Sequence, residues 1–93
     1  MVHATVQNTG NAELRNIEVD YPNASFGLPT LAPGQQFQYE FQTEDPGSLT
    51  VKFEDAGGKS FSDKGPAVVA NQRGTLLIDL NVNGHVGWHP EWK

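Results

Sequence analysis

Three histidines are the residues that first raise the question of chemistry in this chain. His85 and His89 are four residues apart, a spacing that would place both imidazoles on one face of a helix to bind zinc. Glycines and a proline surround this pair and oppose a helix there. His3 lies at the other end of the chain. We therefore expect no metal site, and His85 and His89 are only weak candidates for metal ligands.

The carboxylates match no catalytic or calcium-binding pattern. Asp55 precedes two glycines and is a weak metal candidate, but its loop lacks the ligand spacing of an EF-hand. Asp79 lies on an apolar segment whose alternation points it outward, whereas a catalytic acid needs an apolar niche that raises its pKa. No nucleophile elbow, phosphate loop or zinc-protease motif occurs. The sequence predicts no enzymatic activity and no cofactor.

Three aromatic residues are the candidates for ligand binding. Tyr21 ends a predicted strand, and Trp88 and Trp92 lie in the C-terminal tail. Exposed flat rings stack on sugars or grip a peptide. The competing interpretation is structural, with a tryptophan folded back to cap an open end of the fold.

Composition limits the class of partner. The chain has 93 residues, which predicts one domain over residues 1–93. Its formal net charge is −5 and its six Lys and Arg residues are scattered, whereas nucleic acid and anionic membranes require clustered cations. The absence of cysteine excludes disulfides and thiolate metal sites. The expected partner is a protein or a glycan, not nucleic acid, and a monomer is the default.

Alternation of apolar and polar residues with period two identifies the strands that must position these side chains. The clearest runs are Phe37, Tyr39, Phe41; Leu49, Val51, Phe53; and Leu76, Ile78, Leu80, Val82. With the turn residues, they predict an all-β, antiparallel sandwich of about seven strands. The inner faces are predicted to be Val6, Ile17, Val19, Phe37, Tyr39, Phe41, Leu49, Val51, Phe53, Leu76, Ile78 and Leu80.

Local details give further expectations. Leu14 is out of phase with the strand that follows it, which predicts a β-bulge near Arg15 and Asn16. Residues 62–66 are expected to form a loop. Residues 84–93 are expected to form a tail without period two. If the strands at 36–42 and 48–54 pair, Lys52 would lie near Glu40.

The turn segments resemble those of bacterial immunoglobulin-like sandwich modules, including cell-adhesion-related repeats of exported proteins. The segments are Val6-Gln7-Asn8-Thr9-Gly10, Leu14-Arg15-Asn16-Ile17-Glu18-Val19, Leu31-Ala32-Pro33-Gly34-Gln35 and residues Gly47 to Gly58. They are similar, too, to short bacterial proteins in which one N-terminal membrane helix carries one such domain. The resemblance spans roughly residues 2 to 58.

The resemblance implies an immunoglobulin-like fold, an extracytoplasmic location (periplasmic or cell surface) and a parent chain tethered to a membrane upstream of Val2. It brings no catalytic residues. The expected function is therefore a non-catalytic binding or structural module. The alternative is a small carbohydrate-binding module that uses Tyr21, Trp88 and Trp92.

Overall fold

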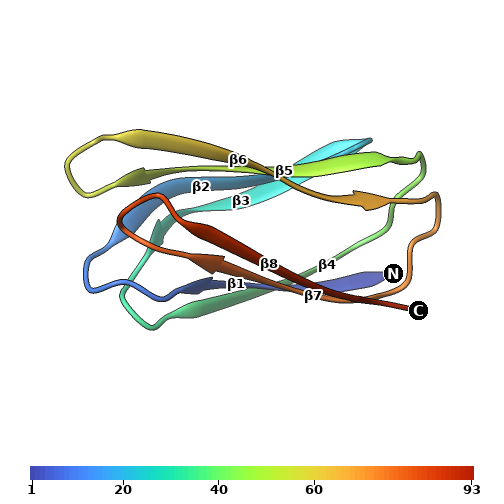
Figure 1. Ribbon diagram of the computed structural model, residues 1–93, viewed down its shortest axis with the longest axis horizontal. Helices are drawn as coiled ribbons and strands as arrows, with labels where there is room; N and C mark the ends of the chain where they lie inside the picture. The colour runs from blue at the N-terminus through green and yellow to red at the C-terminus, as the bar shows by residue number, and fades with distance from the viewer.

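The computed structural model describes residues 1–93 and consists of eight β-strands without a helix (Figure 1). The strands are β1 (Val2–Asn8), β2 (Leu14–Tyr21), β3 (Ala24–Leu31), β4 (Gln36–Phe41), β5 (Gly47–Asp55), β6 (Ser60–Val68), β7 (Gly74–Leu80) and β8 (Val86–Trp92). No segment forms a helix of the length and apolarity needed to cross a membrane.

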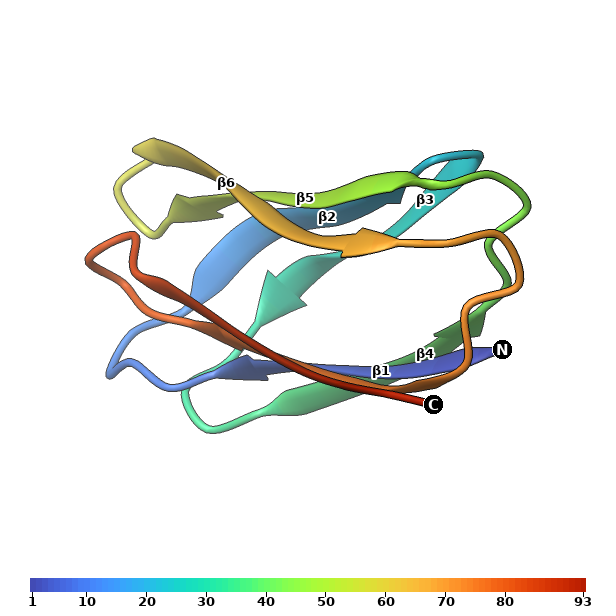
Figure 2. The ribbon, with the colours of Figure 1, turned by 45° about the vertical axis from the view of Figure 1, so that its right-hand side comes forward.

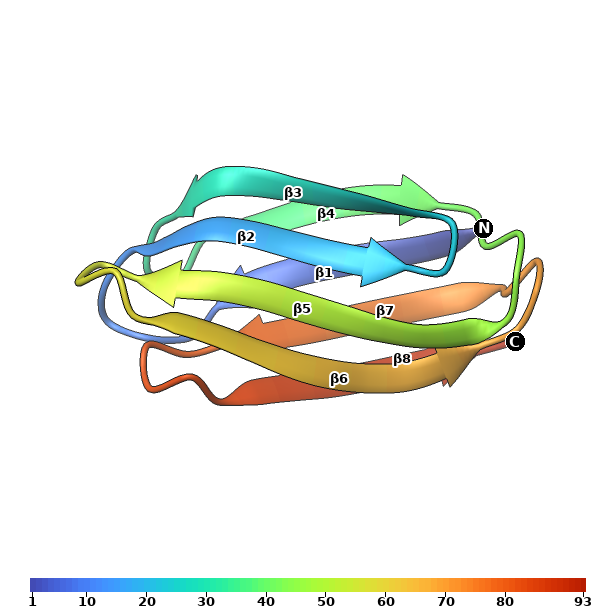
Figure 3. The ribbon, with the colours of Figure 1, turned by 90° about the horizontal axis from the view of Figure 1, so that it is seen from above.

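The strands form two four-stranded sheets that pack face to face (Figure 2). One sheet has the order β4-β1-β7-β8 and is called the terminal sheet because it holds both ends of the chain. The other has the order β3-β2-β5-β6 and is called the hairpin sheet because it consists of two hairpins. Seen from above, β3 overlies β4 and β6 overlies β8 (Figure 3). The molecule therefore has two open sides, the β3/β4 side and the β6/β8 side.

The all-β sandwich predicted from the sequence is confirmed, with two differences in detail. Neighbouring strands are antiparallel except β1 and β7, which run parallel with Val2 opposite Gly74. The strand count is eight and not about seven. The additional strand is Val86–Trp92, in the segment expected to be a non-periodic tail. β8 pairs with β7 along its whole length. Backbone hydrogen bonds to β7 therefore hold this segment as a strand, although its own sequence lacks a clear alternation.

Residues 62–66, expected to form a loop, lie in the middle of β6. Their composition is typical of loops, but Asp63 and Lys64 pair with β5 as an edge strand. Pro66 lies where the β5–β6 register shifts, a position that tolerates a residue without an N–H.

The core consists of the inward side chains of both sheets. Sixteen buried apolar residues form one cluster. It contains every predicted inner-face residue except Phe37 and Tyr39. Phe37 is half-buried and Tyr39 is 38% exposed. Their strand, β4, lies at the edge of its sheet, where only part of the inner face is covered.

The bulge predicted near Arg15 and Asn16 is confirmed. The β2–β5 register shifts between Arg15 and Glu18, and Asn16 adopts a φ of 50°. Asparagine tolerates this left-handed conformation better than other non-glycine residues. The extra residue lets Leu14 and Ile17 both face the core.

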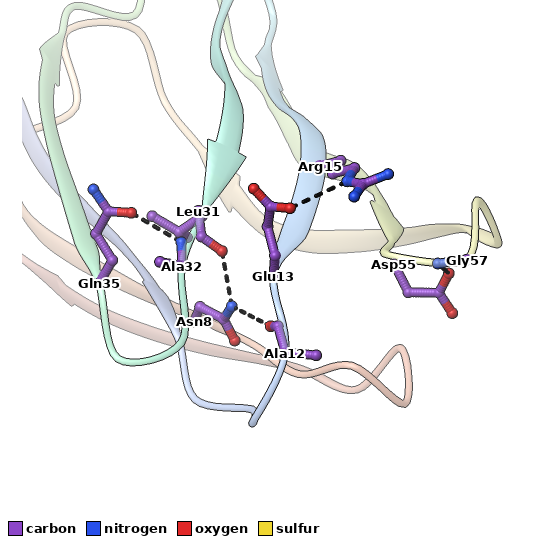
Figure 4. A network of polar contacts seen from close by, with 9 residues as sticks. All are labelled: Asn8, Ala12, Glu13, Arg15, Leu31, Ala32, Gln35, Asp55 and Gly57. Atoms are coloured by element: carbon purple, nitrogen blue, oxygen red, sulfur yellow. Dashed lines mark hydrogen bonds and ion pairs between the residues drawn. The ribbon is translucent and has the colours of Figure 1, made fainter.

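A buried asparagine closes the end of the sandwich at which β1 finishes (Figure 4). The Asn8 amide nitrogen donates to the carbonyls of Ala12 at 2.8 Å and Leu31 at 2.9 Å. Its oxygen accepts from the N–H of Gly10 at 2.9 Å. These bonds tie the β1–β2 turn to the end of β3, and they satisfy a side chain that is fully buried.

The predicted proximity of Lys52 and Glu40 is wrong. The two residues belong to different sheets, since β4 pairs with β1 and β5 pairs with β2. Lys52 lies 3.6 Å from Asp20 on the hairpin sheet. Glu40 lies 3.5 Å from His3 on the terminal sheet.

Candidate functional site

Tyr21 packs into the β3/β4 side of the sandwich. Its ring stacks on Phe41 with centroids 4.4 Å apart and is tilted against Phe26 at 6.4 Å. Desolvation raises the pKa of the Tyr21 phenol above its ordinary value of 10.0, and the charges of Tyr39 and Glu44 add to the shift. The ring is thus a half-buried part of an aromatic stack.

Trp88 lies on the opposite, β6/β8 side. It faces inward from β8, opposite Ile78, and packs against the core. Its indole N–H donates to the Asp63 carboxylate of β6 at 2.7 Å. A side chain at Gly65 would come within 2.7 Å of the indole ring, so the ring rests on this glycine. Trp88 therefore bridges the edges of the two sheets.

Trp92 is also half-buried and packs against the core, on the strand position opposite Gly74. The three aromatic candidates are not brought together, because Tyr21 and Trp88 close opposite sides of the molecule. Each of the three rings contributes to packing.

The metal-ligand candidates are also separated. His89 faces outward from β8, and His85 precedes that strand. Four residues of extended chain span about 13 Å, so the helical spacing that linked them does not apply. Asp55 is at the end of β5, where its carboxylate accepts from the N–H groups of Gly57 and Lys59, both at 2.9 Å. No group of three or more His, Cys, Asp or Glu side chains is placed to hold a metal ion.

The outer face of the terminal sheet holds a shallow depression of about 430 Å³. Two cross-strand rows of side chains line it. They are Glu40, His3, Thr75 and Glu91 in one row, and Gln38, Thr5, Leu77 and His89 in the next. Each row takes one residue from each of the four strands, and the covered core beneath holds the strands in register.

Two pairs, each of an imidazole and a carboxylate, lie in or beside this depression. His3 Nδ1 is 3.5 Å from Glu40, and His89 Nε2 is 3.1 Å from Asp79. The two rows offer hydroxyl, amide, imidazole and carboxylate groups around one apolar side chain, Leu77. Such a surface can bind a polar ligand through several hydrogen bonds. The rows join residues up to 88 positions apart, as in His3 and Glu91, so no local sequence signal could have found them.

A second polar group lies on the outer face of the hairpin sheet. A hydrogen bond with the Asp20 carboxyl and the negative charge of that carboxyl raise the pKa of Glu18 above its ordinary value of 4.5. Lys52, 4.0 Å from Glu18 and 3.6 Å from Asp20, opposes this shift. The three side chains are partly or largely exposed and form a solvated charge cluster, and Glu18 and Lys52 line an open depression of about 400 Å³ on this face.

Comparison with known proteins informs the fold alone. No protein-family model matches the chain, and no curated protein is similar to it. The chain is similar to one solved structure described as "NMR structure of the protein from Eubacterium rectale". The TM-score is 0.67 at 15% identity, over 99% of this chain and 89% of the other. The similarity supports the two-sheet architecture and assigns no activity.

Proposed function

We propose that this chain is a non-catalytic, immunoglobulin-like binding or structural module that acts outside the cytoplasm. The observation that carries the proposal is the depression on the terminal sheet. Its lining comes from four strands that a continuous core holds in fixed register, so the surface is organised before a ligand arrives. The partner is a protein or a glycan, because the lining offers both hydrogen-bond donors and hydrogen-bond acceptors.

The immunoglobulin-like assignment is supported by the hairpins β2–β3, β5–β6 and β7–β8, joined by connections that cross between the sheets. The extracytoplasmic location, with a membrane-tethered parent chain, is supported by the resemblance of the turn segments to exported bacterial modules. Fractionation of cells that express the native gene tests it. Recovery in the cytoplasmic fraction would contradict it.

A substitution that fills the depression tests the binding proposal. Thr75→Arg places a long side chain at its floor, and Ser62→Arg adds the same charge to the outer face of the other sheet. Amide chemical shifts of the labelled protein are followed during titration with soluble polysaccharides and extended peptides. Ligand-induced shifts are expected along β1 and β7, to be lost in Thr75→Arg and to persist in Ser62→Arg. Shifts confined to the hairpin sheet would refute the proposal.

The alternative, carbohydrate binding by Tyr21, Trp88 and Trp92, requires rings that are engaged in packing to turn toward solvent. It predicts a saturable change in tryptophan fluorescence with polysaccharide. If a glycan instead binds the depression, the amide shifts change while the fluorescence of the two tryptophans does not.

A further inference from the structure

The four edge strands of the sandwich differ in how they are protected. Three of them contain a proline: Pro29 in β3, Pro66 in β6 and Pro90 in β8. Proline removes a backbone donor and blocks the approach of another strand. β4, with the sequence Gln-Phe-Gln-Tyr-Glu-Phe, has no proline and pairs with β1 without a register shift. It is the edge best suited to receive a further strand.

The hydrogen-bonding groups of β4 that face away from the sheet can be identified. The N–H of Asn8 donates to Gln35, beside β4, and the N–H of Thr9 donates to Leu80 of β7. In an antiparallel pair, every second residue of a strand exchanges hydrogen bonds with its neighbour. Counted from Gln35, the residues of β4 that bond to β1 are Phe37, Tyr39 and Phe41. The N–H and C=O groups of the alternate residues, Gln36, Gln38 and Glu40, therefore point outward from the edge.

The side chains around this edge suit a protein interface. β3 and β4 together carry one charged residue, Glu40. Tyr39 is 38% exposed and stacks on Phe26 with centroids 4.3 Å apart, and Phe37 is half-buried beside it. Aromatic enrichment with few charges is typical of the buried centre of an interface. On the other side, β6 and β8 carry Asp63, Lys64 and Glu91.

We propose that β4 pairs antiparallel with β4 of a second copy of this chain and forms a two-fold homodimer. The pairing is centred on Gln38, which faces Gln38 of the other copy. This register joins the outward N–H and C=O groups of both strands. It also sets Glu40 opposite Gln36 and Tyr39 opposite Phe37, so that the one carboxylate of each strand meets an amide that can donate to it. No like charges face each other, and the exposed tyrosine ring is covered.

A charge swap at the two-fold axis tests this pairing. Gln38 is exposed on the outer face, so Gln38→Glu and Gln38→Lys should both fold. Each variant places two like charges opposite each other and should weaken the dimer about fivefold to tenfold. An equimolar mixture of the two should recover at least the wild-type association, because opposite charges then meet. Sedimentation equilibrium of each sample over a wide range of protein concentration measures the dissociation constants.

Removal of the backbone donor provides a second, independent test. Gln38→Pro deletes an N–H that points away from β1, and the symmetry of the pair deletes two hydrogen bonds from the dimer. We expect association to weaken about 100-fold or more. Gln38→Thr keeps the donor and suits a strand, so it should dimerise like the wild type. Circular dichroism and urea unfolding establish that both variants fold.

Three results would overturn the proposal. One is a wild-type chain that stays monomeric at every concentration tested. Another is a Gln38→Pro variant that is folded and still dimeric. The third is a Gln38→Lys variant that, without the Gln38→Glu variant, associates more strongly than the wild type. That result would indicate that Gln38 faces Glu40 of the other copy, so the two-fold axis would lie elsewhere.

Discussion

Side chains cover the β3/β4 side and the β6/β8 side of this sandwich in different ways. On the β6/β8 side, each edge strand contributes an aromatic ring that rests on a glycine of the other sheet, in β6 itself or in the turn between β7 and β8. Trp88 lies against Gly65, and Phe61 lies against Gly84. The indole N–H also reaches Asp63. On the β3/β4 side, rings pack on rings, with Phe26 between Tyr39 and Phe41, and part of the aromatic surface stays exposed.

The difference shows how edge position and composition act together. Glycine lets a large ring approach the opposite backbone, and a hydrogen bond then fixes its orientation, so the β6/β8 side is complete within one chain. The β3/β4 side has little charge and keeps an unprotected strand edge, which is the condition for pairing with another strand. The β6/β8 side is therefore filled by side chains of a single chain, and we propose that the β3/β4 side associates with a second copy.

The largest effect is expected at the centre of the β3/β4 stack. Phe26 is 7% exposed and contacts rings of β2 and β4. Phe26→Ala should lower the free energy of unfolding by about 3–4 kcal/mol, because it leaves a cavity in the core. Tyr39→Ala, on the exposed edge of the same stack, should cost about 1–2 kcal/mol. Equal losses in urea unfolding would show that Phe26 is not the centre of this side.

On the β6/β8 side, adding a methyl group should act through crowding. Gly65→Ala brings its Cβ to about 2.7 Å from the Trp88 ring and should cost about 1–3 kcal/mol. Gly57→Ala, in the exposed β5–β6 turn, is the matched control and should cost less. If the clash is the cause, the Gly65→Ala penalty shrinks when Trp88→Ala is also present. If Gly65→Ala costs the same free energy of unfolding with and without Trp88, contact between this glycine and the indole ring is not the cause.

The hydrogen bond of Trp88 is expected to contribute less than the packing of its ring. Trp88→Phe keeps most of the apolar contact and loses the donor, so the free energy of unfolding should fall by about 1 kcal/mol. Adding Asp63→Ala to Trp88→Phe should then have little further effect, because the bond is already absent. Thermal unfolding of the four proteins measures the coupling, and fully additive losses would contradict the bond.

Alkaline pH should affect the β3/β4 side through Tyr21. Its pKa is raised in the folded state, so folding disfavours the phenolate and stability is complete below the ordinary tyrosine pKa of 10.0. Stability should then fall as the pH rises through the raised value. Urea midpoints at about pH 9 and about pH 11 should differ less for Tyr21→Phe than for the wild type. An equal drop in both proteins would assign the effect to other groups.

The smallest effect is expected on the outer face of the hairpin sheet, away from both sides. Asp20 raises the pKa of Glu18, so Asp20→Asn should lower it toward 4.5, and Lys52→Met should raise it further. Because the folded-state pKa is raised, the contribution of Glu18 to stability is present at low pH and is lost as the pH rises through this pKa. Carboxyl carbon NMR titration measures the pKa directly, and shifts of the same sign in both variants would contradict the assignment.

The strands with the clearest alternation were the best predicted from the sequence. β4, β5 and β7 each carry at least three apolar residues at alternate positions, although β4 lies at an edge and the other two lie inside their sheets. β6 and β8 lie at edges, where loop-forming residues and proline are tolerated, and their strands were not predicted in full. The alternation of Val86, Trp88 and Trp92 was the available signal for β8, and Pro90 interrupts it.

The candidate site was less accessible to such reasoning. Tyr21, Trp88 and Trp92 were singled out as aromatic residues, but whether a ring is exposed or packed depends on the residue across the sandwich. The depression on the terminal sheet combines side chains from four strands, and their order in the sheet differs from their order in the chain. Its residues could not be assembled from local patterns.

The sequence by itself determined the all-β class, the bulge near Asn16 and most of the buried face, because period-two alternation and turn chemistry are local properties of the chain. Only the tertiary structure decided which strands became edges, which aromatic rings met a glycine and which met another ring, and which polar side chains shared a surface. Those outcomes depend on pairing between residues far apart in the chain. Local periodicity fixes which face of a strand is apolar, but it does not choose the strand that will cover it.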